Sequence, residues 1–181
     1  MKVTPTALPE VLIIEPQVFG DDRGFFFESF NARRFEQLTG LALHFVQENH
    51  SRSARNVLRG LHYQVRHPQG KLVRVVAGAI FDVVVDMRRS SPFFGRWIGL
   101  VLSAENRRQL WVPPGFAHGF VVTSESAECL YSTTDYWSPE DERVIRWNDP
   151  ALAIEWPIQG APMLSGKDSQ GLLLADAEAF P

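Results

Sequence analysis

Glycine and proline interrupt this chain at short intervals, and apolar runs fill the spaces between them. The 181 residues include 13 Gly and 12 Pro, spread along the whole sequence without a linker, an internal repeat or a low-complexity stretch. Short runs separated by turn residues about every ten positions are typical of an all-β sandwich or barrel. The length suits one domain over residues 1–181, and a hydrophobic content of 45% can fill its core.

The pattern of apolar runs predicts the individual elements. We expect strands at residues 11–14, 25–30, 45–48, 58–64, 72–77, 80–87, 95–103, 109–112, 119–122 and 127–135. Asn31 can cap a short helix over 32–38 that ends at Gly40. The tail from Asp149 onward is interrupted by Pro and Gly. It is predicted to wrap the barrel, with a weak helical tendency at 175–178.

Charge and cysteine content limit the classes of function. The formal net charge of −3 argues against a nucleic-acid partner. The single cysteine, Cys129, cannot form an internal disulfide, which favours a reducing compartment. Met1 is not followed by a long apolar run, so neither a signal peptide nor a membrane span is expected. A cytoplasmic protein without a membrane partner is therefore predicted.

Three basic residues lie within thirteen positions of an otherwise apolar segment: Arg59, His62 and Lys71. Their positive charges repel one another unless an anion lies among them. Arg is charged at any working pH, His titrates near neutrality, and Lys is a point-charge donor. The cluster suits an anionic substrate that loses a proton, although a solvated basic strand face is the alternative.

A second segment has the spacing Pro-x-Gly-x-x-His, in which Pro113, Pro114 and Gly115 lead to His118 on the next apolar strand. This resembles the second cupin motif. The first cupin motif carries His-x-His, whereas this chain has Gln64 two residues after His62, so the metal-ligand set is short. The chain resembles an all-β, cupin-type double-stranded β-helix (a jelly-roll barrel) with short peripheral helices and no metal.

Seven blocks in sequence order resemble the dTDP-4-dehydrorhamnose 3,5-epimerase family. They are residues 19–28, 45–51, 57–62, 69–74, 114–120, 131–137 and 164–168. The resemblance implies a homodimer that shares its first strands. It also implies conversion of dTDP-4-dehydro-6-deoxy-D-glucose to dTDP-4-dehydro-L-rhamnose without a cofactor. Hydrogens at C3 and C5 are both α to the C4 ketone, so inversion needs a base, an acid and a group that stabilises the enolate oxygen.

The resemblance assigns four catalytic residues. His62 is the base, and Asp168 orients its ring and stabilises the imidazolium. Tyr131 is the acid, and Lys71 holds the C4 oxygen as charge develops. Without the family, each has an ordinary structural alternative. His62 would be a hydrogen-bonded strand histidine and Asp168 a turn residue, while Tyr131 would pack in the core and Lys71 would lie at a strand edge.

The same resemblance assigns the substrate contacts. Arg23 and Arg59 would bind the diphosphate through their planar guanidinium groups. Trp137 occupies the position of a tyrosine that stacks on thymine in many members. The remaining contacts are Glu28, Gln47, Asn49, His118, Glu142 and Lys167. Surface ion pairs, core packing and loop hydrogen bonds are the alternatives for these residues, and Tyr63 is expected to pack rather than react.

Strand alternation raises one conflict. Tyr131 and Trp137 share a face on an unbroken strand, but Arg59 and His62 do not. The resemblance to the family places both Arg59 and His62 in the site, and a bulge or kink at Gly60 could turn both side chains into it.

Other activities remain open at this point. Some members of the family invert C3 alone or C5 alone. A ketoisomerase would keep the barrel but move the keto group along the sugar, and it differs from an epimerase only in the atom that receives the proton. A non-catalytic sugar-binding cupin would not need His62, Tyr131 and Asp168 together. The missing His-x-His argues against a metal-dependent cupin oxygenase.

Overall fold

The computed structural model describes residues 1–181. Its strands are β1 (Lys2–Pro5), β2 (Leu12–Glu15), β3 (Val18–Asp21), β4 (Gly24–Phe27), β5 (Gln47–Ala54), β6 (Leu58–Gln64), β7 (Lys71–Ala77), β8 (Ala79–Asp86), β9 (Trp97–Ser103), β10 (Gln109–Val112), β11 (Phe116–Val122), β12 (Ser126–Thr133) and β13 (Glu142–Val144). The helices are α1 (Ala32–Thr39) and a 3-10 turn, Asp168–Gln170. None of them has the length and apolar character needed to cross a bilayer.

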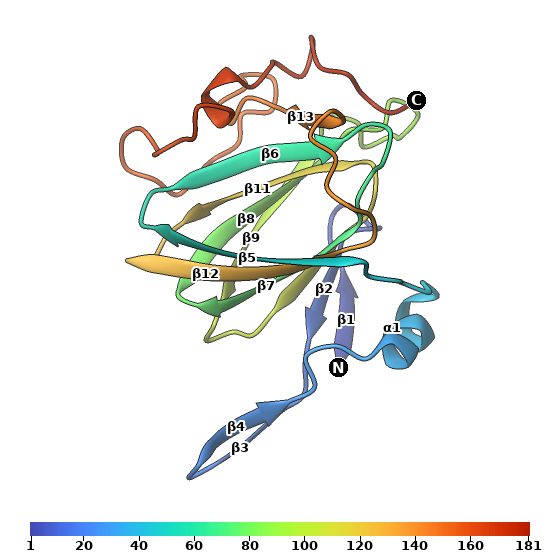
Figure 1. Cartoon of the computed structure of the whole chain (residues 1–181), viewed down its shortest axis with the longest axis vertical. Coiled ribbons are helices and arrows are strands. Elements are labelled where there is room, and N and C mark those ends of the chain that lie inside the picture. The colour runs from blue at the N-terminus through green and yellow to red at the C-terminus, as the bar shows by residue number, and fades with distance from the viewer.

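The strands form two facing sheets and one separate hairpin (Figure 1). One sheet has the order β1-β2-β10-β7-β12-β5 and the other has the order β13-β6-β11-β8-β9. The predicted all-β jelly roll is confirmed. The strand ladders remain two separate sheets and do not close into a continuous barrel.

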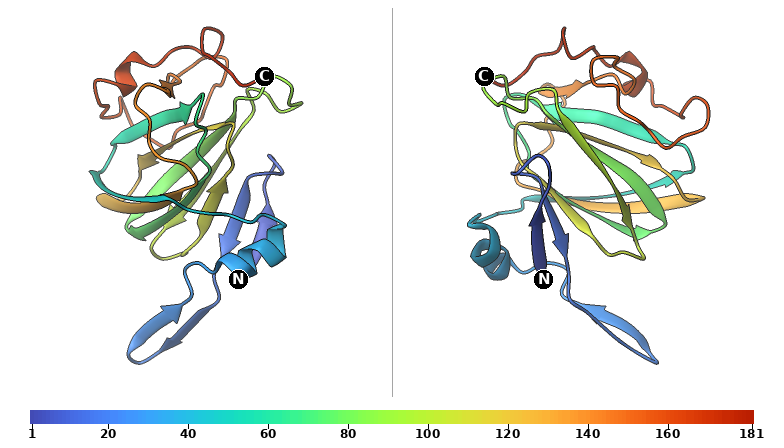
Figure 2. Two further views of the ribbon diagram at one scale, coloured as in Figure 1. Left: turned by 45° about the vertical axis from the view of Figure 1, so that its right-hand side comes forward. Right: turned by 180° about the vertical axis from the view of Figure 1, so that it is seen from behind.

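The main core lies between the sheets, because alternate residues of each strand face inward. Val73 and Cys129 of the six-stranded sheet belong to the same buried cluster as Val84 and Phe120 of the five-stranded sheet. The opposite face of the five-stranded sheet packs on the C-terminal tail in a second cluster that includes Leu152. The tail therefore covers this sheet, as its position in Figure 2 also indicates.

Helix α1 has the ends that the sequence predicts. The side chain of Asn31 accepts a hydrogen bond from the backbone N–H of Arg34 at 3.0 Å. Gly40 adopts a φ of 74° and donates its N–H to the carbonyl of Glu36. The helix buries Phe35 edge-on against Trp111, which covers the outer face of the six-stranded sheet.

The segment around residue 25 differs from the prediction of a strand over 25–30. Strand β4 ends at Phe27 and pairs only with β3, and the β3–β4 hairpin projects away from the two sheets (Figures 1 and 2). Phe25 and Phe26 are 62% and 71% exposed. An apolar run predicts an extended backbone, but it does not reveal that this hairpin pairs with no other strand of the chain.

Other boundaries also differ. The strand expected at 45–48 is β5, which runs from Gln47 to Ala54. Its residues are polar on both faces, so no apolar alternation marks it in the sequence. Strand β12 ends at Thr133, so the alternation that was to carry Tyr131 and Trp137 on one face stops before Trp137. Residues 174–176 form a turn, and the helix expected at 175–178 is absent. The hydroxyl of Tyr63 donates to the carbonyl of Glu178 at 2.5 Å.

The predicted irregularity at Gly60 is present. In the β6–β11 pairing, His62 lies opposite His118 while Arg59 lies opposite Phe120, so β6 contains one extra residue. Gly60 has a φ of 122°, and a Cβ atom there would lie 2.6 Å from the Cα atom of Gly119. The two strands can approach this closely only because both positions lack side chains.

Candidate active site

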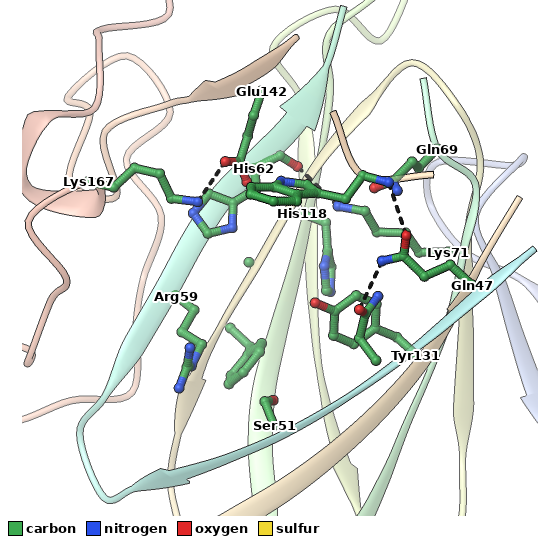
Figure 3. Close-up of a pocket in the computed structure, with 14 residues that line it drawn as sticks. Gln47, Ser51, Arg59, His62, Gln69, Lys71, His118, Tyr131, Glu142 and Lys167 are labelled. Atoms are coloured by element: carbon green, nitrogen blue, oxygen red, sulfur yellow. Dashed lines mark hydrogen bonds and ion pairs between the residues drawn. The ribbon is translucent and has the colours of Figure 1, made fainter. Parts of the chain in front are cut away.

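A cavity of about 300 Å³ opens between the two sheets (Figure 3). Ten of the predicted site residues line it: Gln47, Asn49, Arg59, His62, Lys71, His118, Tyr131, Trp137, Glu142 and Lys167. His62 and His118 come from the five-stranded sheet, whereas Lys71 and Tyr131 come from the six-stranded sheet. The cavity therefore has a histidine wall that faces a wall with an ammonium group and a phenol.

His62 is bound from behind by a carboxylate. Its Nε2 atom lies 2.5 Å from Oδ1 of Asp168, at the start of the 3-10 turn. The other oxygen of Asp168 accepts a hydrogen bond from the hydroxyl of Ser165 at 2.7 Å, and the N–H of Gly60 points at Oδ1 from 3.4 Å. An ionised carboxylate only accepts, so Nε2 carries the ring proton and Nδ1, which has no partner in the chain, keeps its lone pair.

The surroundings keep this pair as a neutral ring beside a charged acid. Burial lowers the pKa of His62 below its ordinary value of 6.5, although Asp168 partly opposes this shift. Burial alone would raise the pKa of Asp168, but hydrogen bonds from His62 and Ser165 hold it below its usual 3.8. At neutral pH, His62 can therefore accept a proton, and Asp168 stabilises the resulting imidazolium.

Lys71 is a buried cation at the end of the cavity. It lies at the first position of β7, and its Nζ atom donates to the carbonyl of His62 at 3.4 Å. Burial lowers the pKa of Lys71 to about 8, against the attraction of Glu142 and Asp82. An ammonium with so few protein hydrogen bonds can bind a substrate oxygen that gains negative charge.

Tyr131 faces the cavity from β12, directly opposite Asn49 in the β12–β5 ladder. Burial raises the pKa of Tyr131, so its phenol is protonated at neutral pH. Gln47, Asn49 and Ser51 follow one another along the same face of β5 and line the cavity beside it. Figure 3 shows Tyr131 and Lys71 on the side of the cavity away from Lys167. The phenol is thus presented among polar groups.

A second histidine–carboxylate pair lies deeper in the same wall. His118 is almost fully buried, and its Nε2–H group donates to both oxygens of Asp82, at 2.9 and 3.0 Å. No three side chains of His, Cys, Asp or Glu converge here or elsewhere in the chain. The ring of His118 is therefore fixed by one carboxylate.

Basic groups line the mouth of the cavity. Arg59 donates through Nε to the hydroxyl of Ser53 at 2.9 Å, which leaves its two terminal nitrogens for a ligand. Lys167 pairs with Glu142 at 2.7 Å, and this contact joins the tail to β13 (Figure 3). Two cationic side chains beside one carboxylate suit an anionic ligand.

Two predicted residues lie outside the cavity within this chain. Arg23 is in the projecting β3–β4 hairpin, where its guanidinium pairs with Asp21 at 2.5 Å. Glu28 follows the hairpin and accepts a hydrogen bond from the side chain of Asn31. The fold of one chain does not bring Arg23 or Glu28 to the other site residues.

The cavity also contains groups that the sequence interpretation missed. Ser51, Gln69, Gly119 and Phe120 line it, and Asp82 lies directly behind it. A signal existed for Asp82, because it is the lone charged residue within the apolar run 80–85. The amide of Gln69 and the hydroxyl of Ser51 had no comparable signal.

Comparison with known proteins places this geometry in a family. A model of the dTDP-4-dehydrorhamnose 3,5-epimerase family matches residues 5–176. The chain belongs to this family. It is 65% identical to the dTDP-4-dehydrorhamnose 3,5-epimerase of Pseudomonas aeruginosa, with all of both chains covered. The family's enzymes are isomerases.

Solved structures support the same assignment. The fold matches a dTDP-6-deoxy-D-glucose-3,5-epimerase from Legionella pneumophila in complex with dTDP-4-keto-L-rhamnose, with a TM-score of 0.95 and 52% identity over 98% of this chain and 94% of that one. It also matches a 3'-monoepimerase from Streptomyces bikiniensis in complex with dTDP-quinovose. That match has a TM-score of 0.89 and 33% identity over 94% and 87% of the two chains. The family's fold thus carries more than one pattern of epimerisation.

Proposed function

We propose that this protein is a dTDP-4-dehydrorhamnose 3,5-epimerase that converts dTDP-4-dehydro-6-deoxy-D-glucose to dTDP-4-dehydro-L-rhamnose. The observation that carries the proposal is the arrangement of the cavity. A neutral histidine held by Asp168 lies on one sheet, and Tyr131 and Lys71 lie on the facing sheet. Inversion of a carbon needs a base and an acid on opposite sides of the sugar, and this cavity supplies both.

His62 acts as the base. Its Nδ1 lone pair removes the hydrogen at C3 or C5, and the electron pair of the broken C–H bond moves into an enolate whose charge lies on the C4 oxygen. Nε2 remains hydrogen-bonded to Asp168, which stabilises the imidazolium that forms. The depressed pKa of His62 keeps it unprotonated at pH 7 before each turnover.

Tyr131 and Lys71 complete the reaction. The ammonium of Lys71 stabilises the enolate oxygen, where a buried charge is worth most because little water screens it. Tyr131 donates its phenolic proton to the carbon from the opposite face and becomes a phenolate. The imidazolium of His62 then releases its proton to solvent, and the phenolate of Tyr131 takes one up, which restores both groups. No electrons are gained or lost overall, so the proposed reaction needs no nicotinamide cofactor, and Lys71 supplies the positive charge that a metal would otherwise bring to the enolate oxygen.

The remaining cavity residues bind the nucleotide. We assign the diphosphate to Arg59 and Lys167, and the thymine ring to the indole of Trp137. Gln47 and Asn49 offer amide groups to the base and sugar, while Glu142 and His118 offer polar contacts to the sugar. Occupation of Lys167 by phosphate would release Glu142 from its ion pair.

A second copy of the chain completes the site. The β3–β4 hairpin leaves Phe19, Phe25 and Phe26 largely exposed, and the contact of the Phe25 ring with the guanidinium of Arg107 does not bury it. We propose a homodimer in which this hairpin packs on the partner and delivers Arg23 and Glu28 to the partner's cavity. The protein is proposed to work in the cytoplasm, in keeping with its single, buried cysteine.

Product analysis tests the activity. Purified protein is incubated with dTDP-4-dehydro-6-deoxy-D-glucose, and the sugar is examined by proton NMR. The proposal requires inversion at both C3 and C5. Inversion at one carbon would replace it with a monoepimerase, a shifted keto group would replace it with a ketoisomerase, and an unchanged sugar would leave only a binding protein.

Mixing two inactive variants tests the shared site. Arg23→Ala and His62→Ala subunits are denatured together and refolded, so that half of the dimers are mixed. If Arg23 serves the partner's site, each mixed dimer has one intact site, and about a quarter of wild-type activity returns. If Arg23 serves its own site, the mixture stays inactive. Light scattering of the unmixed protein checks that it is dimeric.

A further inference from the structure

The segment that carries Trp137 is fixed in an unusual way. Tyr136 and Trp137 are 64% and 55% exposed, so core packing does not hold their side chains. From Asp135 to Trp137, no backbone group bonds to another backbone group. Side-chain groups hold this short loop instead. The hydroxyl of Thr133 donates to the carbonyl of Asp135, the carboxylate of Asp135 accepts the N–H of Tyr136, and glutamine amides bond to the rest.

Gln64 holds the loop on both sides of Trp137. Its Oε1 atom accepts the N–H of Ser138 at 2.9 Å, and its Nε2 atom donates to the carbonyl of Tyr136 at 3.2 Å. Nε2 also donates to the carbonyl of His67 at 2.7 Å. Gln64 lies at the end of β6, is only 4% exposed and does not line the cavity. Its amide thus supplies residues 136–138 with the hydrogen bonds that a neighbouring strand would otherwise make.

Two further glutamines hold neighbouring groups. Oε1 of Gln47 accepts the N–H of Trp137 itself at 3.1 Å, and Nε2 of Gln69 donates to the carbonyl of Asp135 at 2.8 Å. Both of these residues line the cavity, so their effects on a ligand can be direct. Gln64 does not touch the cavity, so it acts on a ligand through the segments that its amide holds, which are residues 136–138 and the backbone at His67. A variant of Gln64 can therefore distinguish a positioning effect from the loss of a direct contact.

We propose that Gln64 is a positioning residue that sets the plane of Trp137 for stacking on the nucleobase, and thereby determines affinity for the nucleoside end of the substrate. This inference rests on the proposed function, which places the base on Trp137. Stacking depends on ring offset and distance. Without Gln64 the loop loses one backbone hydrogen bond on each side of the indole, at Tyr136 and at Ser138, and the ring loses its alignment. The catalytic groups on β6, β7 and β12 stay in place.

The test is a double-mutant cycle on dTDP binding, measured by titration calorimetry on the full-length protein. The variants are Gln64→Leu, Trp137→Ala and the two combined. We expect Trp137→Ala to weaken dTDP binding about tenfold and Gln64→Leu to weaken it three- to tenfold. The combined variant should bind within about twofold of Trp137→Ala, because Gln64 acts through that ring.

Pyrophosphate serves as the control ligand, since it carries the anionic groups without a base. Its affinity should be the same in Gln64→Leu and wild type, and kcat should change less than about twofold while KM rises. If Gln64→Leu does not fold, Gln64→Asn keeps an amide one methylene too short, and it should show the same selective loss.

Three results would overturn the inference. Unchanged dTDP affinity in the Gln64 variant, multiplicative effects in the double variant, or an equal loss for pyrophosphate would each show that Gln64 only supports the fold. A wild-type protein that binds no dTDP would overturn the proposed function as well. Wild-type epimerisation together with an unaffected Gln64 variant would overturn the positioning role alone.

Discussion

Replacing Asp168 by Asn should slow the reaction and move its pH dependence in a defined direction. The change removes one negative charge and keeps the shape of the side chain. The Asn side chain can therefore still accept a hydrogen bond from Nε2 of His62 and form one with the hydroxyl of Ser165. A hydrogen bond to a charged group contributes about 1.5–3 kcal/mol. If all of this is lost from the imidazolium-like transition state, kcat falls roughly 10- to 150-fold.

The pH profile carries the sharper signature. Asp168 raises the pKa of His62 against the lowering effect of burial. Removing its charge must therefore lower that pKa further. The base is active when unprotonated, so the acidic limb of kcat/KM, which lies below pH 6.5 in the wild type, should move to still lower pH in Asp168→Asn.

The assay is the initial rate of product formation from dTDP-4-dehydro-6-deoxy-D-glucose at a series of pH values. Asp149→Asn is a matched control, because Asp149 is also a buried carboxylate that accepts backbone N–H groups, from Ala151 and Leu174. It should lower Tm without moving the pH profile. An unchanged kcat in Asp168→Asn, or an acidic limb that moves upward, would refute the assignment of the pair.

Three further predictions follow from named contacts. Burial lowers the pKa of Lys71 to about 8, and the cation is the useful form, so kcat/KM should fall as the pH rises through about 8. Lys71→Met should reduce kcat/KM most below pH 8, and it should lack this basic limb. Arg59→Ala should raise KM about tenfold or more with a smaller change in kcat, as steady-state kinetics would show, because its free guanidinium nitrogens bind phosphate. Gly119→Ala should cost about 1–3 kcal/mol by chemical denaturation, because the new Cβ would lie 2.7 Å from the carbonyl of Arg59; unchanged stability would contradict the close strand approach.

Local sequence rules predicted much of the fold. The Asn31 and Gly40 ends of α1 follow from capping chemistry. The irregularity at Gly60 follows from strand parity together with the family resemblance, which places both Arg59 and His62 in the site. Most of β5 was missed because almost every residue in it is polar, so it shows no apolar alternation. The projection of the β3–β4 hairpin away from the sheets was also not predicted, since an apolar run does not identify the surface on which it packs.

The candidate site was predicted mainly through the family resemblance. Spacing alone favoured a core tyrosine at Tyr131 and a turn residue at Asp168. Only the fold brings Tyr131 into the cavity with His62 and places Asp168 behind the His62 ring. The contribution of Gln64 could not be predicted from the sequence. Its amide bonds to a loop more than seventy positions away, and no local pattern marks such a contact.

Deuterium exchange in heavy water tests the central claim, that His62 removes a proton on one side and Tyr131 returns one on the other. Wild-type protein and the variants His62→Ala and Tyr131→Phe are incubated with dTDP-4-dehydro-6-deoxy-D-glucose, and the sugar is followed by proton NMR. We predict inversion with deuterium at C3 and C5 for wild type, deuterium without inversion for Tyr131→Phe, and neither for His62→Ala. Exchange that persists in His62→Ala, or full inversion by Tyr131→Phe, would contradict the account.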